Sequence, residues 1–387
     1  MNKIEMRPEF VRGAAEVSAG RHGLAIHRLP SWVREQFPDP QLMAMQAQPS
    51  GVHLAFVTEA EHLSLVSHTS RVVYLGLDRP RGCIDVVVDG ELYVRDVLSG
   101  GDRFEIDMQN GRQQLVTGSS HTSEITLPAG RKRVELWLPH NEALELIELR
   151  ADAALESYDD DPRQFRWLHH GSSISHGSNA SGPTEIWPVA VARAASVRLQ
   201  NLGFGGSALV DPVIARAIRD TPADLITLKL GINVVNHDAM RLRAFVPAIH
   251  GFLDTIREGQ AETPIVLISP IFCGIHEATP GPGSIDPASF ATGVPKFSAS
   301  GDPAEVAAGR LTLEVIREAL ASVVQARSDD AQLHYLDGLE LYGAADAAEL
   351  PLPDNLHPDS EGHALIAARF GERVFAEHGL FWRGAAN

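Results

Sequence analysis

The stretch Asp224-Leu225-Ile226-Thr227-Leu228-Lys229-Leu230 runs directly into Gly231-Ile232-Asn233. Its apolar residues occupy neighbouring as well as alternate positions, which is typical of a strand buried on both faces of a parallel sheet. Pro264–Ser269 has the same character, and Phe245–Arg257 between the two has a helical pattern. Buried strands that alternate with helices predict a parallel sheet covered by helices on both faces. We therefore expect an α/β fold in this part of the chain.

The alternation of strands and helices continues on both sides of this stretch. Further strands and helices are expected at Arg166–His169, Trp187–Val197, Val213–Arg219, Ala304–Ala326, His334–Asp337 and Ser360–Glu377. Asp211 is the expected N-cap of the third of these segments, and Asp359 that of the last. Cys273–Asp302 has no clear period and leaves the end of the Pro264–Ser269 strand. That position predicts a lid or substrate-binding wall, with a tolerated surface insertion as the alternative.

The first 150 or so residues have a different pattern, with many short strands and almost no helical periodicity. An Asp-Gly pair separates the runs Cys83–Val88 and Glu91–Val94 and predicts a two-residue hairpin. Pro128-Ala129-Gly130 separates Glu124–Leu127 from Arg133–Leu138 and predicts a second hairpin. Many short strands joined by turns favour an antiparallel β-sandwich.

The two patterns meet at a polar segment that contains Asp159-Asp160-Asp161-Pro162. Polar, proline-containing segments are typical of domain boundaries. We therefore expect a β-sandwich domain at residues 1–158 and an α/β domain at residues 159–387.

Composition excludes several classes of protein and partner. The chain carries a formal net charge of −17 and has no basic run. Because such a chain repels phosphate backbones, we expect no nucleic-acid partner. Its two cysteines, Cys83 and Cys273, exclude a disulfide framework and are expected to be buried. No apolar run approaches the roughly 20 residues that span a bilayer, and no signal peptide is visible. We therefore expect a cytoplasmic protein without a membrane partner.

Four short segments that lie far apart in the chain carry the groups that acyl transfer needs. They are Gly171-Ser172-Ser173-Ile174, Asn201–Gly206, Gly231-Ile232-Asn233 and Asp354-Asn355-Leu356-His357-Pro358. In that order they can supply a serine nucleophile, a backbone N–H donor, an amide donor and an Asp–His pair. Acyl transfer requires a group that attacks, a base that takes its proton and donors that hold the oxyanion. The first three segments follow strands, so they are expected at the carboxyl edge of one sheet.

One of these segments has a second interpretation. Gly203–Ala208 matches the dinucleotide-binding pattern G-x-G-x-x-[G/A] after a possible strand at Ser196–Leu202, and Asp224 is an acidic residue about 20 positions further on. This interpretation leaves the serine, the asparagine and the Asp–His pair without roles. Acyl transfer is therefore the favoured hypothesis.

Three histidines surround Ser173 in sequence. They are His169, His170 and His176. No carboxylate or thiolate stands at metal-ligand spacing beside them, so we predict no metal and no cofactor. His176 is instead a candidate substrate-binding residue.

Taken together, the four segments resemble the blocks of the SGNH (GDSL-type) hydrolase superfamily. The resemblance covers roughly residues 163–380 and implies a flavodoxin-like three-layer α/β/α domain. It implies a catalytic triad of Ser173, His357 and Asp354. The oxyanion hole would consist of the Ser173 and Gly206 N–H groups and the Asn233 amide. The family's Gly-Asp-Ser is Gly171-Ser172-Ser173 here, so the hydrogen bonds around this turn should differ.

The resemblance extends to a two-domain subgroup whose N-terminal sandwich is similar to carbohydrate-binding modules. It implies a serine esterase that acts on a small-molecule or carbohydrate ester through an acyl-enzyme. Some members of the subgroup are acyltransferases, so transfer of the acyl group from an ester or thioester to an alcohol is the alternative. A carbohydrate-binding protein without turnover is a further alternative. The oligomeric state is left open.

Overall fold

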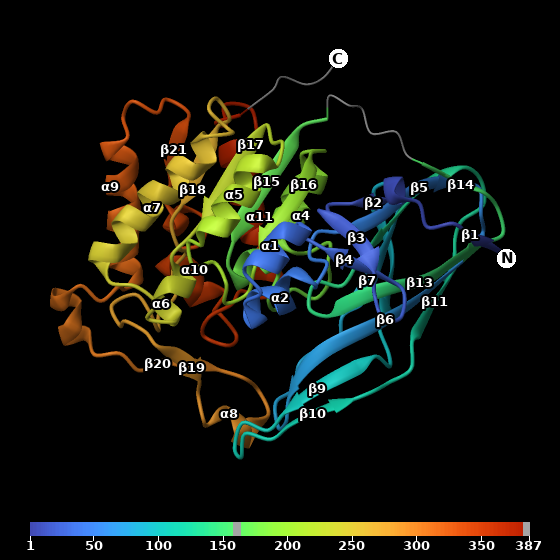
Figure 1. Ribbon diagram of the computed structural model, residues 1–387, viewed down its shortest axis with the longest axis horizontal. Coiled ribbons are helices and arrows are strands. Elements are labelled where there is room, and N and C mark those ends of the chain that lie inside the picture. The colour runs from blue at the N-terminus through green and yellow to red at the C-terminus, as the bar shows by residue number, and fades with distance from the viewer. Residues whose placement is uncertain (158–163, 382–387) are drawn as a thin grey trace. The chain divides into compact units, whose positions relative to one another are not determined.

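The computed structural model describes residues 1–157 and 164–381 (Figure 1). Contacts between residues divide the chain into two units. The N-terminal unit comprises Met1–Arg34, Met43–Gln164 and Gly182–Thr184, and the C-terminal unit comprises Glu35–Leu42, Phe165–Ser181 and Glu185–Asn387. The expected boundary segment, Asp159 to Pro162, lies outside the described residues.

The N-terminal unit contains two sheets. The larger has the strand order β10-β9-β6-β13-β4-β3, with β1 beside β13 and β11 beside β6. Its strands are β1 (Asn2–Ile4), β3 (Glu16–Ala19), β4 (Leu24–His27), β6 (His62–Tyr74), β9 (Asp102–Ile106), β10 (Gln113–Val116), β11 (His121–Thr126) and β13 (Ala143–Ala151). The smaller has the order β14-β5-β12-β7-β8, with β2 beside β5. Its strands are β2 (Val11–Arg12), β5 (His53–Thr58), β7 (Cys83–Val88), β8 (Glu91–Val97), β12 (Lys132–Trp137) and β14 (Leu155–Ser157).

Apolar side chains from both sheets form one core, which includes Leu54, Leu65, Val86 and Leu136. Among the described strands of this unit, every pairing is antiparallel except β6 with β9. The short elements outside the sheets are the 3₁₀ turn η1 (Pro8–Phe10) and the helices α1 (Ser31–Gln36) and α2 (Pro40–Gln46), and each of these helices has residues assigned to both units. The predicted sandwich is thus confirmed in its layers and, with that one exception, in its strand directions.

One of the two predicted hairpins forms. Strands β7 and β8 pair antiparallel across the Asp-Gly turn. The hairpin predicted around Pro128-Ala129-Gly130 is wrong, because β11 pairs with β6 whereas β12 pairs with β5 and β7. The turn therefore carries the chain from one sheet to the other. Residues near a turn specify a reversal of direction but not which sheet the next strand joins.

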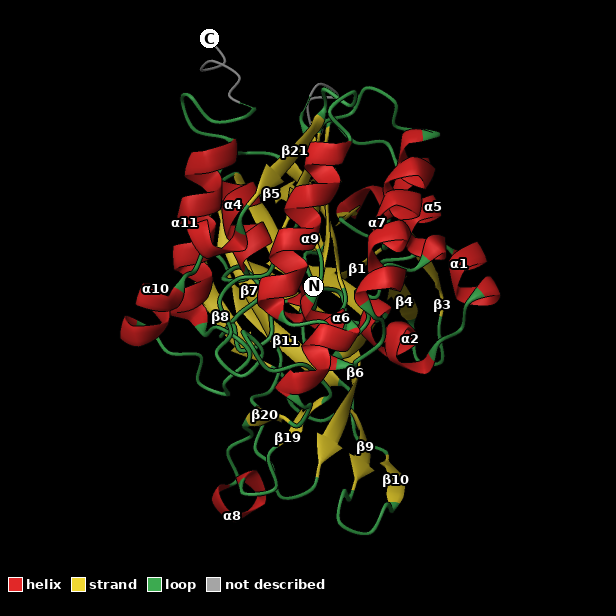
Figure 2. Ribbon diagram, turned by 90° about the vertical axis from the view of Figure 1, so that its left-hand side faces the viewer, coloured by secondary structure: helices red, strands yellow, loops and turns green. Residues whose placement is uncertain are grey.

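The C-terminal unit contains a five-stranded parallel sheet with the order β16-β15-β17-β18-β21. Its strands are β15 (Arg166–Gly171), β16 (Arg198–Gly203), β17 (Leu225–Lys229), β18 (Ile265–Ile268) and β21 (Leu333–Leu336). The helices are α3 (Ser173–His176), α4 (Trp187–Ala194), α5 (Pro212–Asp220), α6 (Ile232–Asn236), α7 (Leu242–Arg257), α9 (Leu313–Ala326), α10 (Ala344–Glu349) and α11 (Ser360–Val374). Figure 2 shows α4 and α11 on one face of this sheet and α5 and α7 on the other. The predicted three-layer α/β/α arrangement is confirmed.

Two predictions about helices need correction. The single helix expected at Ala304–Ala326 is two elements, a 3₁₀ segment η2 (Pro303–Ala308) and α9, because Gly309 has a φ of +91° and Thr312 begins a new helix by accepting a hydrogen bond from Val315 N. Asp211 precedes α5, but its side chain does not cap it. Burial and the neighbouring Asp39 instead raise the pKa of Asp211 to about 6.

The segment expected to lack regular structure also contains short elements. They are β19 (Gly283–Ile285), α8 (Ser289–Thr292) and β20 (Phe297–Ala299), and the two strands pair antiparallel. A further 3₁₀ turn, η3 (Gly338–Glu340), follows β21. In the part of the chain that the structure describes, no helix is both long and apolar enough to cross a membrane.

Candidate active site

Three neighbouring strands of the parallel sheet, β16, β15 and β17, bring three of the four segments together. Gly171 ends β15 and pairs with Gly203 of β16 on one side and with Lys229 of β17 on the other. Each strand then runs into the segment identified from the sequence, so their loops share the carboxyl edge of the sheet. Phe204 N also donates a hydrogen bond to Gly171 O at 2.8 Å, which ties two of these loops to each other.

Glycine is required at the start of the serine loop by close packing. A Cβ on Gly171 would lie 2.5 Å from the Ser175 hydroxyl oxygen. Ser173 is the first residue of α3 and is separated by Ser172 from a strand that cannot carry a side chain at its last position. Ser172, which replaces the aspartate of the resembled motif, has a buried hydroxyl without a hydrogen-bond partner in the described chain. The Ser172 side chain thus forms no hydrogen bond with the described residues around this turn.

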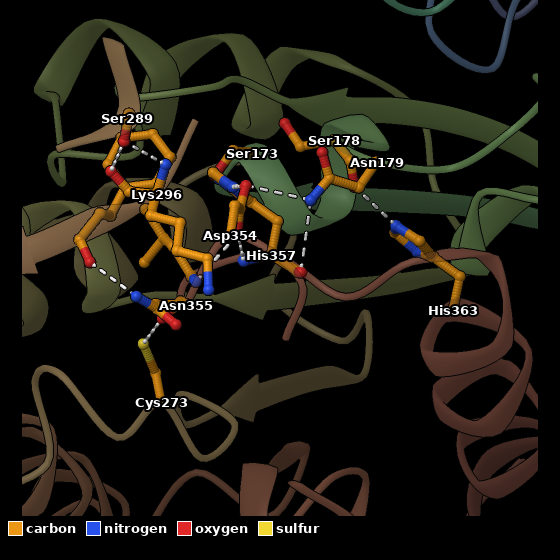
Figure 3. A network of polar contacts seen from close by, with 12 residues as sticks. Ser173, Ser178, Asn179, Cys273, Ser289, Lys296, Asp354, Asn355, His357 and His363 are labelled. Atoms are coloured by element: carbon orange, nitrogen blue, oxygen red, sulfur yellow. Dashed lines mark hydrogen bonds and ion pairs between the residues drawn. The ribbon is translucent and has the colours of Figure 1, made fainter. Parts of the chain in front are cut away.

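Ser173, His357 and Asp354 form a continuous chain of hydrogen bonds (Figure 3). The Ser173 Oγ lies 2.8 Å from Nε2 of His357, and Nδ1 of the same ring lies 2.7 Å from Oδ2 of Asp354. The imidazole therefore donates through Nδ1 to the carboxylate and accepts from the hydroxyl at Nε2. This tautomer is the one in which histidine can remove a proton from serine.

The Asp354 carboxylate is fixed by its own backbone loop as well. Its Oδ1 accepts hydrogen bonds from Leu356 N at 2.9 Å and from His357 N at 2.7 Å. Burial alone raises the pKa of this carboxyl, but the hydrogen bonds and the His357 ring outweigh burial and hold the pKa below its ordinary value. Asp354 is thus a fixed anion, and it can stabilise an imidazolium that forms next to it. Helix α11 begins just beyond this loop, and Asp359 caps it as predicted by accepting from Gly362 N.

Three N–H groups on the loops at this edge of the sheet make no hydrogen bond to any residue that the structure describes. They are Ser173 N, Gly206 N and Nδ2 of Asn233. Ser173 N is free because it is the first N–H of a helix. The Asn233 Oδ1 accepts from Ala208 N at 3.1 Å, so the amide is anchored through its oxygen and its NH₂ end is left over. The structure therefore provides three unused donors on the three loops named from the sequence.

Gly206 lies in a backbone conformation that side chains rarely adopt, with a φ of +70°. A Cβ there would lie 3.3 Å from Nε2 of Gln41 and 3.4 Å from Nε2 of His237. The Gln41 Nε2 in turn donates to Gly205 O at 2.8 Å. Gln41 thus supports the loop that carries the Gly206 N–H, although it comes from a distant part of the sequence.

Sequence reasoning missed two residues that contact the Asp–His loop. Asn179 donates from Nδ2 to Asp354 Oδ2 at 3.0 Å. Phe297 of β20 donates from its backbone N to Asp354 O at 2.9 Å, and its own carbonyl accepts from Asn355 Nδ2 at 3.1 Å. Its ring packs edge-on against the His357 imidazole, with centroids 5.5 Å apart and planes at 79°. The segment predicted as a lid or wall therefore contacts the candidate site through Phe297. No spacing in the sequence signals either contact.

The other histidines named from the sequence are buried beneath the site. His169 lies between Thr227 Oγ1 and Ser175 Oγ, each 2.7 Å from one of its ring nitrogens. His170 and His176 each place Nδ1 near a backbone carbonyl of β16. His176 is only 3% exposed, and its role in substrate binding stays a prediction.

The dinucleotide interpretation conflicts with the position of Asp224. This residue precedes β17 and pairs with Arg166, whose Nη2 lies 2.9 Å from its Oδ1. Arg166 is the first residue of β15, so the pair lies at the amino ends of the strands. The glycine-rich loop lies at the carboxyl end of β16, and the acidic residue of a dinucleotide site must also be at a carboxyl end. Asp224 therefore cannot bind a ribose held at this loop.

Comparisons with known proteins find one family and several similar structures. Residues 170–365 match the model of the GDSL-like Lipase/Acylhydrolase family. The salicylyl-acyltransferase SsfX3 from a tetracycline biosynthetic pathway has a similar structure, with 28% sequence identity, a TM-score of 0.77 and coverage of 95% of both chains. A search of curated protein sequences finds no match.

Two more distant structures share the fold. A protein from Bacteroides ovatus described as a GDSL-like lipase has 17% identity and a TM-score of 0.66 over 93% of both chains. A family two carbohydrate esterase from Clostridium thermocellum, solved with cellohexaose, has 14% identity and a TM-score of 0.55, over 83% of this chain and 91% of its own.

Proposed function

The chain belongs to the GDSL-like lipase/acylhydrolase family, and we propose that it hydrolyses an acyl ester through a covalent intermediate on Ser173. The observation that carries this proposal is the hydrogen-bonded chain from the Ser173 hydroxyl through His357 to Asp354. A serine hydroxyl is a weak nucleophile, and a base within hydrogen-bonding distance is what activates it.

The first half of the reaction forms the acyl-enzyme. His357 Nε2 takes the proton as Ser173 Oγ attacks the carbonyl carbon of the ester. The negative charge that develops on the carbonyl oxygen is held by the Ser173 and Gly206 N–H groups and the Asn233 amide, because these donors form no hydrogen bond with any described residue. The tetrahedral intermediate then collapses, the C–O bond to the alcohol breaks, and the imidazolium returns its proton to the departing alcohol.

The second half releases the acyl group. A water molecule gives its proton to His357 Nε2 and attacks the same carbonyl carbon. The second tetrahedral intermediate expels Ser173, which regains a proton from the imidazolium. The Asp354 carboxylate keeps the ring oriented throughout and stays ionised, in agreement with its lowered pKa. Every proton is transferred by these residues, so the reaction needs no cofactor.

Acyl transfer is the second candidate, because the acyltransferase SsfX3 is similar to this chain over 95% of both proteins. In this case an alcohol replaces water in the second half, and His357 removes its proton in the same way. We propose a small-molecule or carbohydrate ester as the substrate. A carbohydrate esterase is among the similar structures, and this likeness in fold alone is the support for a carbohydrate ester. A cytoplasmic location stays a prediction, as does substrate binding by His176.

A burst experiment tests the proposal. With an activated ester such as p-nitrophenyl acetate, one equivalent of p-nitrophenol should appear rapidly as Ser173 is acylated. Ser173→Ala should abolish the burst and lower kcat by about a millionfold, and a fluorophosphonate should no longer label the protein. Ser178→Ala is the matched control, because this nearby serine uses only its backbone atoms in hydrogen bonds. A full burst in the Ser173→Ala variant would refute the assignment.

Product analysis separates the two candidate reactions. A panel of acyl esters and thioesters is incubated with and without added alcohols and sugars. Free acid that accumulates at the same rate with every acceptor supports hydrolysis. A new ester that forms faster than the free acid supports acyl transfer, and the acceptor that gives it identifies the second substrate.

A further inference from the structure

Two histidines and an aspartate lie close together in the N-terminal unit. His22, His68 and Asp102 each offer one nitrogen or oxygen atom, and these three atoms lie within 4.8 Å of one another. Two imidazoles and a carboxylate are donors that first-row transition metals accept. The cluster belongs to the sandwich and shares no residue with the ester chemistry proposed above.

The strand register explains why these residues meet. His68 of β6 pairs with Glu145 of β13, and Ser70, two positions along β6, pairs with Asp102 of β9. Side chains two positions apart point to the same face of a sheet. Asp102 therefore lies diagonally beside His68, on the face that also carries Glu145. Strands β6 and β9 can be followed side by side in Figure 1.

Glu145 brings in the third residue. Its Oε2 accepts hydrogen bonds from the backbone N of His22 at 2.6 Å and of Gly23 at 2.8 Å. These bonds hold the turn between β3 and β4 beside β13 and so place the His22 ring over β6. The rings of His22 and His68 are stacked, with centroids 3.7 Å apart and planes at 18°. Three segments of one sheet thus meet at this cluster through specific hydrogen bonds.

His68 and Asp102 each have a further polar contact that orients the side chain, as metal ligands usually do. The His68 Nδ1 lies 3.2 Å from the Ser120 hydroxyl, which directs the other nitrogen toward Asp102. The Asp102 Oδ1 accepts from Gly118 N at 3.1 Å. Contacts of this kind fix the orientation of the ligating groups and raise metal affinity.

The His68 Nε2 is a buried nitrogen that faces Asp102. The residue is only 3% exposed, and no described residue forms a hydrogen bond of acceptable geometry with this nitrogen. It lies 3.2 Å from Asp102 Oδ1, while Nε2 of His22 lies 4.0 Å from Oδ2. A cation bound between these atoms would satisfy the buried nitrogen. Stacked rings direct their nitrogens in parallel, but the His22 side chain is 30% exposed, so its ring is free to turn toward a shared ion.

We propose that His22, His68 and Asp102 form a binding site for a divalent transition-metal ion such as Zn²⁺, with water completing the coordination. The ion would join the β3–β4 turn, β6 and β9, and it would therefore stabilise the sandwich. The competing explanation is a simple ion pair between a protonated His68 and Asp102, assisted by Arg21, whose Nη1 lies 4.0 Å from Asp102 Oδ2. An ion pair requires neither His22 nor a metal.

The test is metal binding by the full chain, prepared without a histidine tag and stripped with a chelator. Titration with Co²⁺ should give the visible absorption of a bound ion at one equivalent. His22→Ala should weaken Co²⁺ and Zn²⁺ binding at least tenfold by removing one ligand of three. His22 lies on a partly exposed turn, so this variant should fold normally. His68→Ala and Asp102→Asn should abolish the signal.

His121→Ala is the matched control, because His121 also pairs with a carboxylate, Asp96, at 2.9 Å, without belonging to a group of three ligands. It should leave the Co²⁺ spectrum unchanged. Absence of any spectrum in the parent protein, or equal binding by the parent and His22→Ala proteins, would overturn the metal site and leave the ion pair. The burst at Ser173 is measured in parallel without metal, so failure of the metal site is distinguishable from failure of the proposed enzyme.

Discussion

Asn179 donates a hydrogen bond to the Oδ2 atom of Asp354, the atom that also accepts from the His357 ring. The two residues are 175 positions apart. Asn179 lies on the loop that follows Ser173, so this bond joins the serine loop directly to the Asp–His loop (Figure 3). It links the loop that carries Ser173 to the loop that carries His357.

We predict that Asn179→Ala lowers kcat about tenfold and changes KM little. A lost hydrogen bond to a charged group corresponds to roughly 1.5 kcal/mol, which is about this factor in rate. Asn179→Asp should be worse, because two neighbouring carboxylates repel each other. The measurement is steady-state kinetics with an activated ester. Asn110→Ala, which removes a similar amide–carboxylate bond with Asp107 in the N-terminal unit, is the control. Equal kcat for Asn179→Ala and the parent would show that Asp354 needs no support from this residue.

The Phe297 ring should contribute more to kcat/KM than the hydrogen bonds of the Phe297 backbone do. Phe297→Ala keeps both hydrogen bonds to the Asp354–Asn355 segment but removes the edge-on contact with His357. We expect kcat/KM to fall by roughly tenfold, since an aromatic contact contributes about 1 kcal/mol and also excludes water from the ring. Phe297→Leu should recover part of the loss. Phe290→Ala, in the same segment, should have little effect, and a similar loss in this control would indicate general disruption of the segment.

Replacement of Asn233 tests the oxyanion donors. Asn233→Asp keeps an oxygen for Ala208 N but has no N–H to donate. We expect a loss of at least about 3 kcal/mol, or roughly a hundredfold in the acylation rate. Asn233→Ala should show a loss of the same order, and both should retain the parent's circular dichroism spectrum. Acylation by Asn233→Asp at nearly the parent rate would remove Asn233 from the oxyanion hole.

Stability should fall in mild acid because of His363. Its Nε2 donates to Ser178 O at 3.0 Å and its Nδ1 accepts from Trp187 N, so the buried ring is neutral. Burial lowers its pKa from 6.5 to about 4. Below pH 6.5 the unfolded chain therefore binds a proton that the folded protein excludes, and the free energy of unfolding decreases until the pH reaches about 4. The full contribution is about 3 kcal/mol.

Urea unfolding at pH 7.5 and pH 5 measures this loss. His363→Gln should lose less stability between the two pH values than the parent protein, and the exposed His378→Gln should match the parent. Some pH dependence remains in the variant, because burial also lowers the pKa of His169. An identical loss in the His363→Gln and parent proteins would contradict the assignment.

The parallel sheet was predictable because its strands are continuous apolar runs separated by helical patterns. Burial on both faces leaves this mark in the sequence itself, as in Leu225–Lys229. The same information does not determine the strand order, which depends on how helices pack. Turn residues were less reliable for predicting which strands pair. Pro128-Ala129-Gly130 was predicted to form a hairpin, but the chain passes there from one sheet to the other. The helix expected from Ala304 failed at Gly309, whose positive φ ends one element before another begins.

The candidate site was predictable where chemistry restricts the residue type. A nucleophile, a base and an anion must be particular residues, and the sequence predicts Ser173, His357 and Asp354 for these roles. Supporting residues are less restricted, because many side chains can donate one hydrogen bond or fill one contact. Asn179 and Phe297 act through three-dimensional proximity alone. These two residues could therefore be identified only from the structure.

The hydrogen bond from Gln41 to Gly205 has a consequence for how the gene can be divided. Glu35–Leu42 belongs with the C-terminal unit although it is encoded far upstream of the parallel sheet. An expression fragment that starts after codon 158 would encode Ser173, Asn233 and His357. It would lack Gln41 and its hydrogen bond to the loop that carries Gly206. The shortest gene fragment that encodes the whole candidate site, with Gln41 included, must therefore start before codon 35.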